Sequence, residues 1–444
     1  MQKDLTKGSA LKNIITFSLP FLLANFLQTF YGMADLFIVG QYNGASSLSG
    51  VSIGSQVMHM LTVMIVGLAM GSTVVIGRYV GEKNQKGIDN TIANTIIIFM
   101  IVSILLTFVL LLLVNPIIHI MATPNEAISE TSLYLKICFI GIPFITAFNV
   151  ISSIFRGLGD SKSPMYFVAV ACFFNIVLDY LFIGYFNMHA MGAALGTVFS
   201  QGISVIISFV SIIKRKMIIL QKENFQIQRS LISNIIKVGF PICAQDGLIQ
   251  ISFIIITVIA NSRGVYISSA VGVVEKIIGF FFLVPSSMLS AISAICAQCI
   301  GTKQHERSVQ TLKYGCFIAV FFGLFITLVC QFVSKDIVSL FSHDRQVVIF
   351  ASQYLRSYVA DCIFAGISFS FGGFFTAYGY SIVSFIHNVI AIILIRVPGA
   401  FLMSKLYPDT LFPMGLTSPM GSLLSATICI FVYIYSKKKQ YFDV

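Results

Sequence analysis

Long apolar segments alternate with short polar segments along the whole chain. Each apolar segment has about 20 residues or more, enough for one α-helix to cross a hydrocarbon layer of about 30 Å. The pattern predicts an all-α polytopic membrane protein. The twelve predicted spans form two sets of six: residues 14–35, 48–75, 92–114, 133–155, 165–184 and 192–213, then 235–259, 268–295, 314–332, 354–375, 382–403 and 415–435.

The composition agrees with a protein whose solvent is lipid. Of 444 residues, 57% are hydrophobic and 10% are charged, whereas roughly a quarter of a typical globular chain is charged. This deficit excludes a water-soluble protein. The net charge is +11, but the basic residues lie between the apolar segments and form no single exposed stripe with interleaved aromatic residues. We therefore expect the lipid bilayer around the chain and no nucleic-acid partner.

The positions of Lys and Arg predict the orientation, because positive residues are retained on the cytoplasmic side of a membrane. With the N-terminus inside, 20 of the 28 Lys and Arg residues fall on cytoplasmic segments. Four fall outside, at Arg263, Lys335, Arg345 and Lys405, and the other four lie within spans. We expect a multi-pass protein of the plasma or inner membrane with both termini in the cytoplasm.

The two halves of the chain repeat each other. Ser18-Leu19-Pro20 opens the first span and Gly239-Phe240-Pro241 opens the seventh, an offset of about 220 residues that other motifs share. Pro20 and Pro241 are candidate hinges. Because each half has an even number of spans, both begin on the same membrane face, and a pseudo-two-fold axis along the membrane normal should relate them.

This repeat predicts the domain organisation. The expected parts are an N-terminal six-helix bundle (1–213), a cytoplasmic linker (214–234) and a C-terminal six-helix bundle (235–444). The two bundles are expected to face each other, and a transporter of this design places its substrate cavity between them.

Five acidic residues lie in or at the edges of the spans: Asp35, Asp179, Asp246, Glu275 and Asp361. An ionisable side chain near the bilayer centre costs about 2.5 to 3.5 kcal/mol on insertion scales. Each acid is therefore a candidate for function, and the alternative for each is a solvated helix end or an internal ion pair. Together they predict a hydrated or mutually satisfied interior.

Asp179 has the most informative surroundings. Asn175 precedes it by four residues, which puts both side chains on one helix face, and Asn149 in the preceding span offers another amide oxygen. Carboxylate and amide oxygens suit a hard cation such as Na⁺, and a desolvated carboxylate is suited to carrying a proton. The residues do not choose between these ions. Asp35 closes its apolar segment, where it could instead reach the external interface.

Two acids of the second half stand near features that affect their role. Asp246 follows Pro241 by five residues, in a region where the proline frees a backbone carbonyl for water or a ligand. Glu275 is followed by Lys276, but adjacent helical residues point about 100° apart. These two residues therefore need not neutralise each other.

Asp361, the third acid of the second half, could have a structural role instead of a functional one. Asp361 could form an ion pair with Arg356 or with Arg396, all of them in predicted spans. Asp246, Glu275 and Asp361 together are candidates for substrate binding or ion coupling.

Several short motifs follow one another along the chain. They are Ser18-Leu19-Pro20, Gly81-Glu82-Lys83-Asn84, residues 155–165 (FRGLGDSKSPM), Asn175 with Asp179, residues 192–197 (GAALGT) and residues 297–301 (AQCIG). Their order resembles that of the multidrug and toxic compound extrusion (MATE) family of secondary transporters. The likeness covers nearly the whole chain, and the duplication of the motifs makes it specific.

The resemblance implies a V-shaped pair of bundles that exports organic, often cationic compounds by alternating access, driven by inward Na⁺ or H⁺. It implies no enzymatic activity and no cofactor besides the coupling ion, and we expect a monomer. Cation binding would let the first span rebend near Pro20. Carried over residue by residue, the cation site of the family falls on Asp35, Asn149, Asn175, Asp179 and Thr197.

In the second half, the resemblance gives a less direct assignment. Sodium-coupled members of the family often place acids in spans seven and ten. Asp246 and Asp361 lie in the corresponding spans of this chain but are shifted by about one turn, so the coupling ion stays open.

Two rival functions follow from other features of the sequence. A lipid-linked-glycan flippase of the same wider superfamily would line its cavity with Arg and Lys, whereas in-span acids outnumber in-span bases here by five to four. Gly157-Leu158-Gly159-Asp160 matches the G-x-G-D motif of intramembrane aspartyl proteases, which makes such an enzyme a remote alternative. That motif runs into a polar turn, so Asp160 and Asp179 should lie at different depths and not share a proton.

Overall fold

A computed structural model describes residues 4–215 and 221–439, and these ranges contain helices and no strand. Within these ranges, ten helices are long and apolar enough to cross a membrane. Two further spans are bent pairs, Asn125–Ile140 with Ile142–Gly157 and Arg345–Tyr358 with Asp361–Ala377, which bend by 51° and 42°. The predicted all-α fold with twelve spans is confirmed, and the protein is a multi-pass membrane protein.

The chain divides into two compact units. Unit 1 comprises Met1–Asp4 and Pro20–Gly239, and unit 2 comprises Leu5–Leu19 and Phe240–Val444. These bounds differ from those expected from the sequence, because residues 5–19 group with the second half and residues 235–239 with the first. Residues 216–220 of the expected linker lie outside the described residues.

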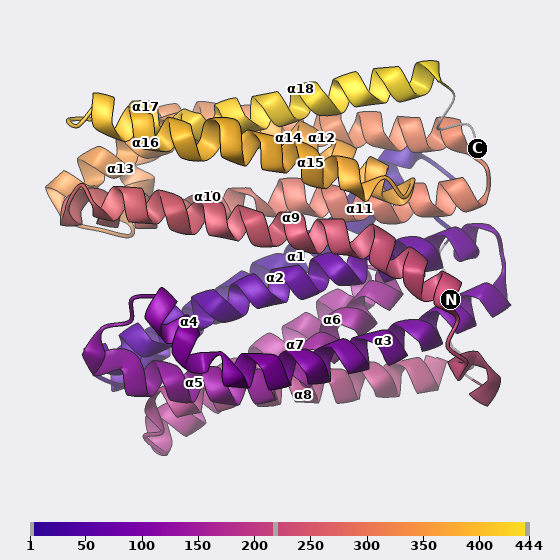
Figure 1. The fold of residues 1–444 in the computed structure, drawn as a ribbon, viewed down its shortest axis with the longest axis horizontal. Helices are drawn as coiled ribbons and strands as arrows, with labels where there is room; N and C mark the ends of the chain where they lie inside the picture. Colours follow the sequence, from indigo (N-terminus) through magenta and orange to yellow (C-terminus); the bar gives the residue numbers. More distant parts are fainter. Residues whose placement is uncertain (1–3, 216–220, 440–444) are drawn as a thin grey trace. The chain divides into compact units, whose positions relative to one another are not determined.

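Unit 1 is a bundle of helices that run side by side (Figure 1). Its first helix starts in unit 2 and enters unit 1 at Pro20. The elements in order are α1 (Ala10–Tyr42), α2 (Ala45–Gly81), α3 (Gln85–Leu112), α4 (Val114–Ile120), η1 (Asn125–Ala127), α5 (Ile128–Ile140), α6 (Ile142–Gly157), α7 (Lys162–Asp179), η2 (Tyr180–Tyr185), α8 (His189–Arg215) and η3 (Lys222–Phe225).

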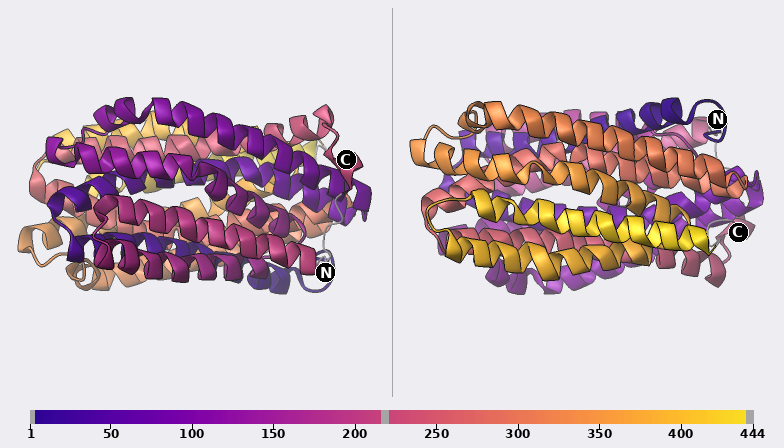
Figure 2. Two further views of the ribbon diagram at one scale, coloured as in Figure 1. Left: turned by 90° about the horizontal axis from the view of Figure 1, so that it is seen from below. Right: turned by 90° about the horizontal axis from the view of Figure 1, so that it is seen from above.

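Unit 2 is also a bundle of helices that run side by side, drawn in orange and yellow in the right-hand view of Figure 2. Its first long helix begins in unit 1 and enters unit 2 at Phe240, one residue before Pro241. The elements are α9 (Arg229–Asn261), α10 (Val265–Phe281), α11 (Leu283–Gly301), α12 (His305–Ser339), α13 (Arg345–Tyr358), α14 (Asp361–Ala377), α15 (Ser381–Ala391), η4 (Ile392–Arg396), α16 (Val397–Leu406), α17 (Phe412–Gly415) and α18 (Thr417–Lys438).

Glycines let the start of α9 approach α2 closely within unit 1. A β-carbon on Gly71 would overlap the backbone carbonyl of Ile235, and one on Gly239 would overlap the carbonyl of Leu68. Small residues allow this close backbone approach between transmembrane helices. The contact explains why the first turns of α9 group with unit 1.

The surface of the bundles is apolar, as lipid contact requires. On α12 the exposed side chains include Phe317, Phe321, Phe325 and Phe332. In water such a surface would be unfavourable. Polar side chains are also buried inside the bundles, and several of their atoms have no hydrogen-bond partner among the described residues.

Candidate cation-binding site

Four helices of unit 1 bring polar side chains together in the bundle interior. Asp35 comes from α1, Asn175 and Asp179 from α7, Asn149 from α6 and Thr197 from α8. The four-residue spacing of Asn175 and Asp179 places them on one face of α7. Both are 0% exposed, Asp35 is 4% exposed and Asn149 is 5% exposed, so none of them is a solvated helix end.

Asp179 lies where the helix changes its geometry. It is the last α-helical residue of α7, and a π-helical segment, η2, follows directly. Short π-helical insertions are rare and occur frequently at functional sites.

The two acids interact with each other and with neighbouring polar groups. The Thr197 hydroxyl donates to Asp35 Oδ2 over 3.4 Å. The side chains of Asp179 and Asn175 lie beside the Asp35 carboxyl group, although no hydrogen bond joins them to it in the described ranges. The structure therefore gathers Asp35, Asn175, Asp179 and Thr197 at one place.

Most oxygen atoms of this cluster have no hydrogen-bond donor among the described residues. Asp35 Oδ1, both carboxylate oxygens of Asp179 and both polar atoms of the Asn175 amide are buried and unpartnered. Two buried carboxylates without a counter-charge are strongly unfavourable. A monovalent cation or a proton bound between them would remove most of that cost.

Gly196 on α8 makes room for one of the carboxylates. A β-carbon at this position would overlap Asp179 Oδ1, so a glycine is needed where the acid contacts the α8 backbone. The sequence motif of residues 192–197 contained this glycine, but only the packing of α7 on α8 reveals its role.

Asn149 is less tightly connected to the cluster than expected. Its Nδ2 atom donates to the Ile145 carbonyl of the same helix over 2.8 Å. No hydrogen bond joins it to Asp35 or Asp179 in the described part of the chain. Its Oδ1 atom is the part of the side chain that could serve a cation.

Two polar residues beside the site were not predicted from the sequence. Tyr31 lies one turn before Asp35 on α1 and is close enough to interact with its charge. Gln201 of α8 donates from Nε2 to the Tyr31 hydroxyl over 3.3 Å. The signal available in the sequence was the four-residue spacing of Tyr31 and Asp35.

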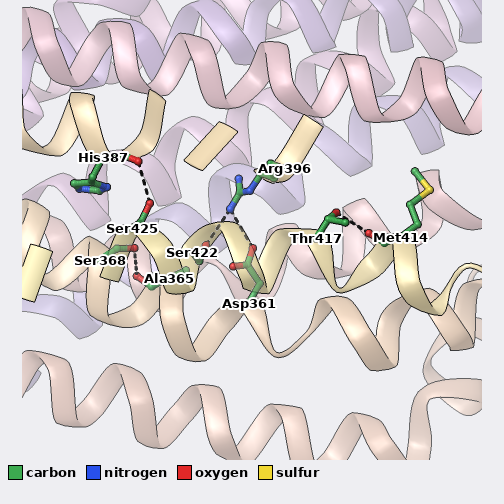
Figure 3. A network of polar contacts seen from close by, with 9 residues as sticks. All are labelled: Asp361, Ala365, Ser368, His387, Arg396, Met414, Thr417, Ser422 and Ser425. Atoms are coloured by element: carbon green, nitrogen blue, oxygen red, sulfur yellow. Dashed lines mark hydrogen bonds and ion pairs between the residues drawn. The ribbon is translucent and has the colours of Figure 1, made fainter. Parts of the chain in front are cut away.

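Unit 2 has an internal ion pair in place of an acid pair (Figure 3). Arg396 Nη2 lies 3.3 Å from Asp361 Oδ2 and donates to Ser422 Oγ over 3.0 Å. Arg356, the other possible partner, instead donates from Nε to Ser334 Oγ over 2.7 Å. Asp361 is thus neutralised by a buried arginine.

Both residues of this ion pair lie at helix ends. Asp361 is the first residue of α14, where a carboxylate is favoured by the helix dipole, and Arg396 ends the π-helical segment η4.

Figure 3 also shows His387, whose backbone carbonyl accepts a hydrogen bond from Ser425 Oγ over 3.3 Å. Both nitrogen atoms of the buried His387 ring have no partner among the described residues.

The other two acids of unit 2 lie apart from a second carboxylate. Thr257 Oγ1 is 3.4 and 3.3 Å from the two carboxylate oxygens of Glu275, so this acid has a hydroxyl partner from α9. Asp246 is half-buried on α9 and lies near Cys243. The structure does not assemble the three candidate acids of unit 2 into one site of the kind found in unit 1.

The structure does not form the Asp160–Asp179 pair that the aspartyl protease interpretation requires. Asp160 precedes α7 and accepts hydrogen bonds from the backbone of Lys162 and Ser163 and from the Ser163 hydroxyl. Asp179 lies at the other end of α7, about 25 Å away along the helix axis. The two acids do not share a proton.

A helical membrane protein with two repeats and, inside one of them, a buried acid pair that has no basic partner among the described residues has the features of a secondary transporter. The family model MatE matches residues 20–181 and again residues 241–402, so each repeat is matched once, starting at Pro20 and near Pro241. The chain belongs to the MatE family of multidrug and toxic compound extrusion transporters, as its motifs predicted.

Similar proteins support this assignment over the full length. The "Probable multidrug resistance protein YpnP" of Bacillus subtilis (strain 168) is 28% identical, covering 98% of this chain and 97% of that protein. The "Probable multidrug resistance protein NorM" of Thermotoga maritima is 26% identical, covering 89% and 86%. A crystal structure of MATE in complex with MaL6 shares the fold, with a TM-score of 0.92 at 20% identity over 99% of each chain.

Proposed function

We propose that this protein is a cation-coupled antiporter that exports organic compounds by alternating access. The observation that carries the proposal is the buried acid pair Asp35–Asp179, whose oxygen atoms have no donors among the described residues except the Thr197 hydroxyl. Such a pair binds a cation favourably and is costly when empty. The site therefore holds Na⁺ or H⁺ for part of the transport cycle.

The ligand set fits both ions. Among the described residues no group of three or more His, Cys, Asp and Glu lies together, and the proposed site has two acids. Two carboxylates with the oxygens of Asn175 and Thr197 provide a hard, oxygen-only site. With one proton shared between the acids, the same site would carry H⁺.

Coupling needs a movement that cation binding favours. The first helix changes unit at Pro20, and a proline inside a helix removes one backbone hydrogen bond and permits bending. We propose that neutralising Asp35 favours a bent form of α1 that binds substrate less tightly. Pro241 gives α9 the same capacity, since that helix changes unit next to it.

The flippase alternative has weaker support. A cavity for large anionic head groups needs several uncompensated basic residues, and in unit 2 the buried Arg396 is already paired with Asp361.

We place the protein in the cytoplasmic (plasma or inner) membrane with both termini inside, because of the distribution of its Lys and Arg residues. We propose that it works as a monomer.

The test is transport of ethidium in proteoliposomes with Na⁺ and H⁺ gradients imposed separately. The proposal predicts accumulation driven by one gradient, and dissipation of that gradient by added ethidium. No accumulation under either gradient would overturn it. The gradient that supports transport identifies the coupling ion.

A further inference from the structure

One side of helix α10 in unit 2 carries small or polar residues and one lysine, beyond the exposed Val265 at the start of the helix. Ser269, Lys276 and Gly279 are exposed and Gly272 is partly exposed, and their spacing of three and four residues places them on one side of the helix. A β-carbon on Gly272 or on Gly279 would meet nothing within 4 Å. This face, which we call the α10 polar face, borders open space.

The opposite side of α10 is buried, so only one side of this helix is exposed. Ile267, Ala270, Val271, Val274 and Ile277 are at most 8% exposed and lie in the core of unit 2. Exposed faces of neighbouring helices, such as that of α12, are instead formed by large apolar side chains. Because an ionisable side chain within a membrane span is costly against lipid and usually faces the bundle interior or a water-filled cavity, we expect the α10 polar face, which carries Lys276, to border water or a ligand.

Lys276 is the charged residue of the α10 polar face. It lies about 17 Å along the helix from its start at Val265, which is too deep for an ordinary interfacial lysine. The neighbouring acid Glu275 points to Thr257 instead. No hydrogen bond or ion pair joins Lys276 to another residue within the described ranges 4–215 and 221–439.

The position of Lys276 in the internal repeat is occupied by an uncharged residue in the first half of the chain. At the offset of 220 residues, Lys276 corresponds to Gln56 of α2 in unit 1. Gln56 is also exposed, as are Ser52 and His59 on the same side of α2. Both repeats thus expose a polar face on the same helix, and a fixed positive charge at this position is present in unit 2.

We propose that Lys276 is a substrate-binding residue that recognises an anionic group. The inference rests on the proposed export function and specifies its substrates, which include zwitterionic and anionic amphiphiles as well as organic cations. Charge complementarity supports it, because an ammonium group that has no ion-pair partner in the described ranges can form a charge-assisted hydrogen bond with a carboxylate or phosphate. The acids of unit 2 do not compete, since Asp361 is paired with Arg396 and Glu275 contacts Thr257.

Two matched dyes test the inference in proteoliposomes. Rhodamine 110 carries a free carboxylate, and rhodamine 123 is its methyl ester, so they differ in one charge. The expected result is that Lys276→Gln lowers kcat/KM for rhodamine 110 about tenfold and changes that for rhodamine 123 less than twofold. Lys276→Arg should keep the transport of both dyes.

A control variant and a second substrate, ethidium, distinguish failure of the Lys276 inference from failure of the proposed export function. Lys313→Gln makes the same change of charge at an exposed position of α12 and should affect neither dye. Equal effects of Lys276→Gln on both dyes, no effect on either, or no transport of rhodamine 110 by the unmutated protein would overturn the role of Lys276 while ethidium transport is intact. Loss of ethidium transport by the unmutated protein would overturn the proposed function itself, and this inference with it.

Discussion

Asp179 and Gly196 are in such close contact that a β-carbon on residue 196 would overlap the Asp179 carboxylate. The α8 backbone is therefore one wall of the proposed cation site. A side chain at this position would push the acid away from Asp35.

Gly196→Ala is predicted to reduce coupled efflux at least tenfold. The added methyl group requires displacement of the carboxylate or of α8, a type of overpacking that costs about 1–3 kcal/mol. Gly202→Ala in the same helix is the matched control, because a β-carbon there meets Phe144 at an ordinary 3.8 Å. Equal efflux rates for the two variants would contradict the role of Gly196.

Asp179→Asn and Asp35→Asn are each predicted to abolish gradient-driven efflux while the protein remains folded. An amide preserves the volume of the side chain and removes the charge that the coupling ion neutralises. The monodispersity of the purified variants and their thermal unfolding report on folding. Asp336→Asn, a change at an exposed acid of α12, should transport normally. An Asp179→Asn efflux rate equal to that of the unmutated protein would reject the site.

The Asp361–Arg396 ion pair is predicted to stabilise unit 2 only as a pair. Removing one partner leaves a buried charge and costs about 3–5 kcal/mol, so Asp361→Asn and Arg396→Gln should each lower the midpoint of thermal unfolding. The double variant should lose less than the sum of the single variants. Strictly additive losses would show that the two side chains do not interact.

Arg307 is predicted to hold the N-terminal segment against unit 2. Its guanidinium group donates to the backbone carbonyls of Leu5, Lys7 and Gly8 over 2.9–3.2 Å, and the Leu5 amide donates to Gln298 Oε1 over 3.0 Å. Hydrogen bonds to a charged group contribute about 1.5–3 kcal/mol each.

Arg307→Gln should therefore raise the rate of amide hydrogen exchange in residues 5–8 by tenfold or more, measured by mass spectrometry. The exposed Lys313→Gln variant is the control and should leave the exchange of this segment unchanged. An unaltered exchange rate in Arg307→Gln would show that other contacts hold the segment.

The spans were predictable because each one needs a long apolar segment, whatever its neighbours. The places where α1 and α9 pass from one unit to the other were not predictable. They depend on which helix packs against which, as in the contact of Gly71 with the α9 backbone. Hydrophobicity along the chain carries no information on that choice.

The candidate site was predictable in part. The membrane cost of an acid pointed to Asp35 and Asp179, and a four-residue spacing pointed to Asn175. The contribution of Gly196 depends on the distance between α7 and α8, which no local pattern encodes. For Asp361 the sequence offered two arginines, and the position of Arg396 next to Ser422 decides between them.

The dependence of ethidium affinity on the coupling ion tests the central claim most directly. Because linkage between two ligands is reciprocal, a cation bound at Asp35 and Asp179 that weakens substrate binding must raise the Kd of ethidium. We predict that the Kd rises with Na⁺ concentration or with acidity in the unmutated protein and is independent of both in Asp179→Asn. The same dependence in both proteins would contradict the account.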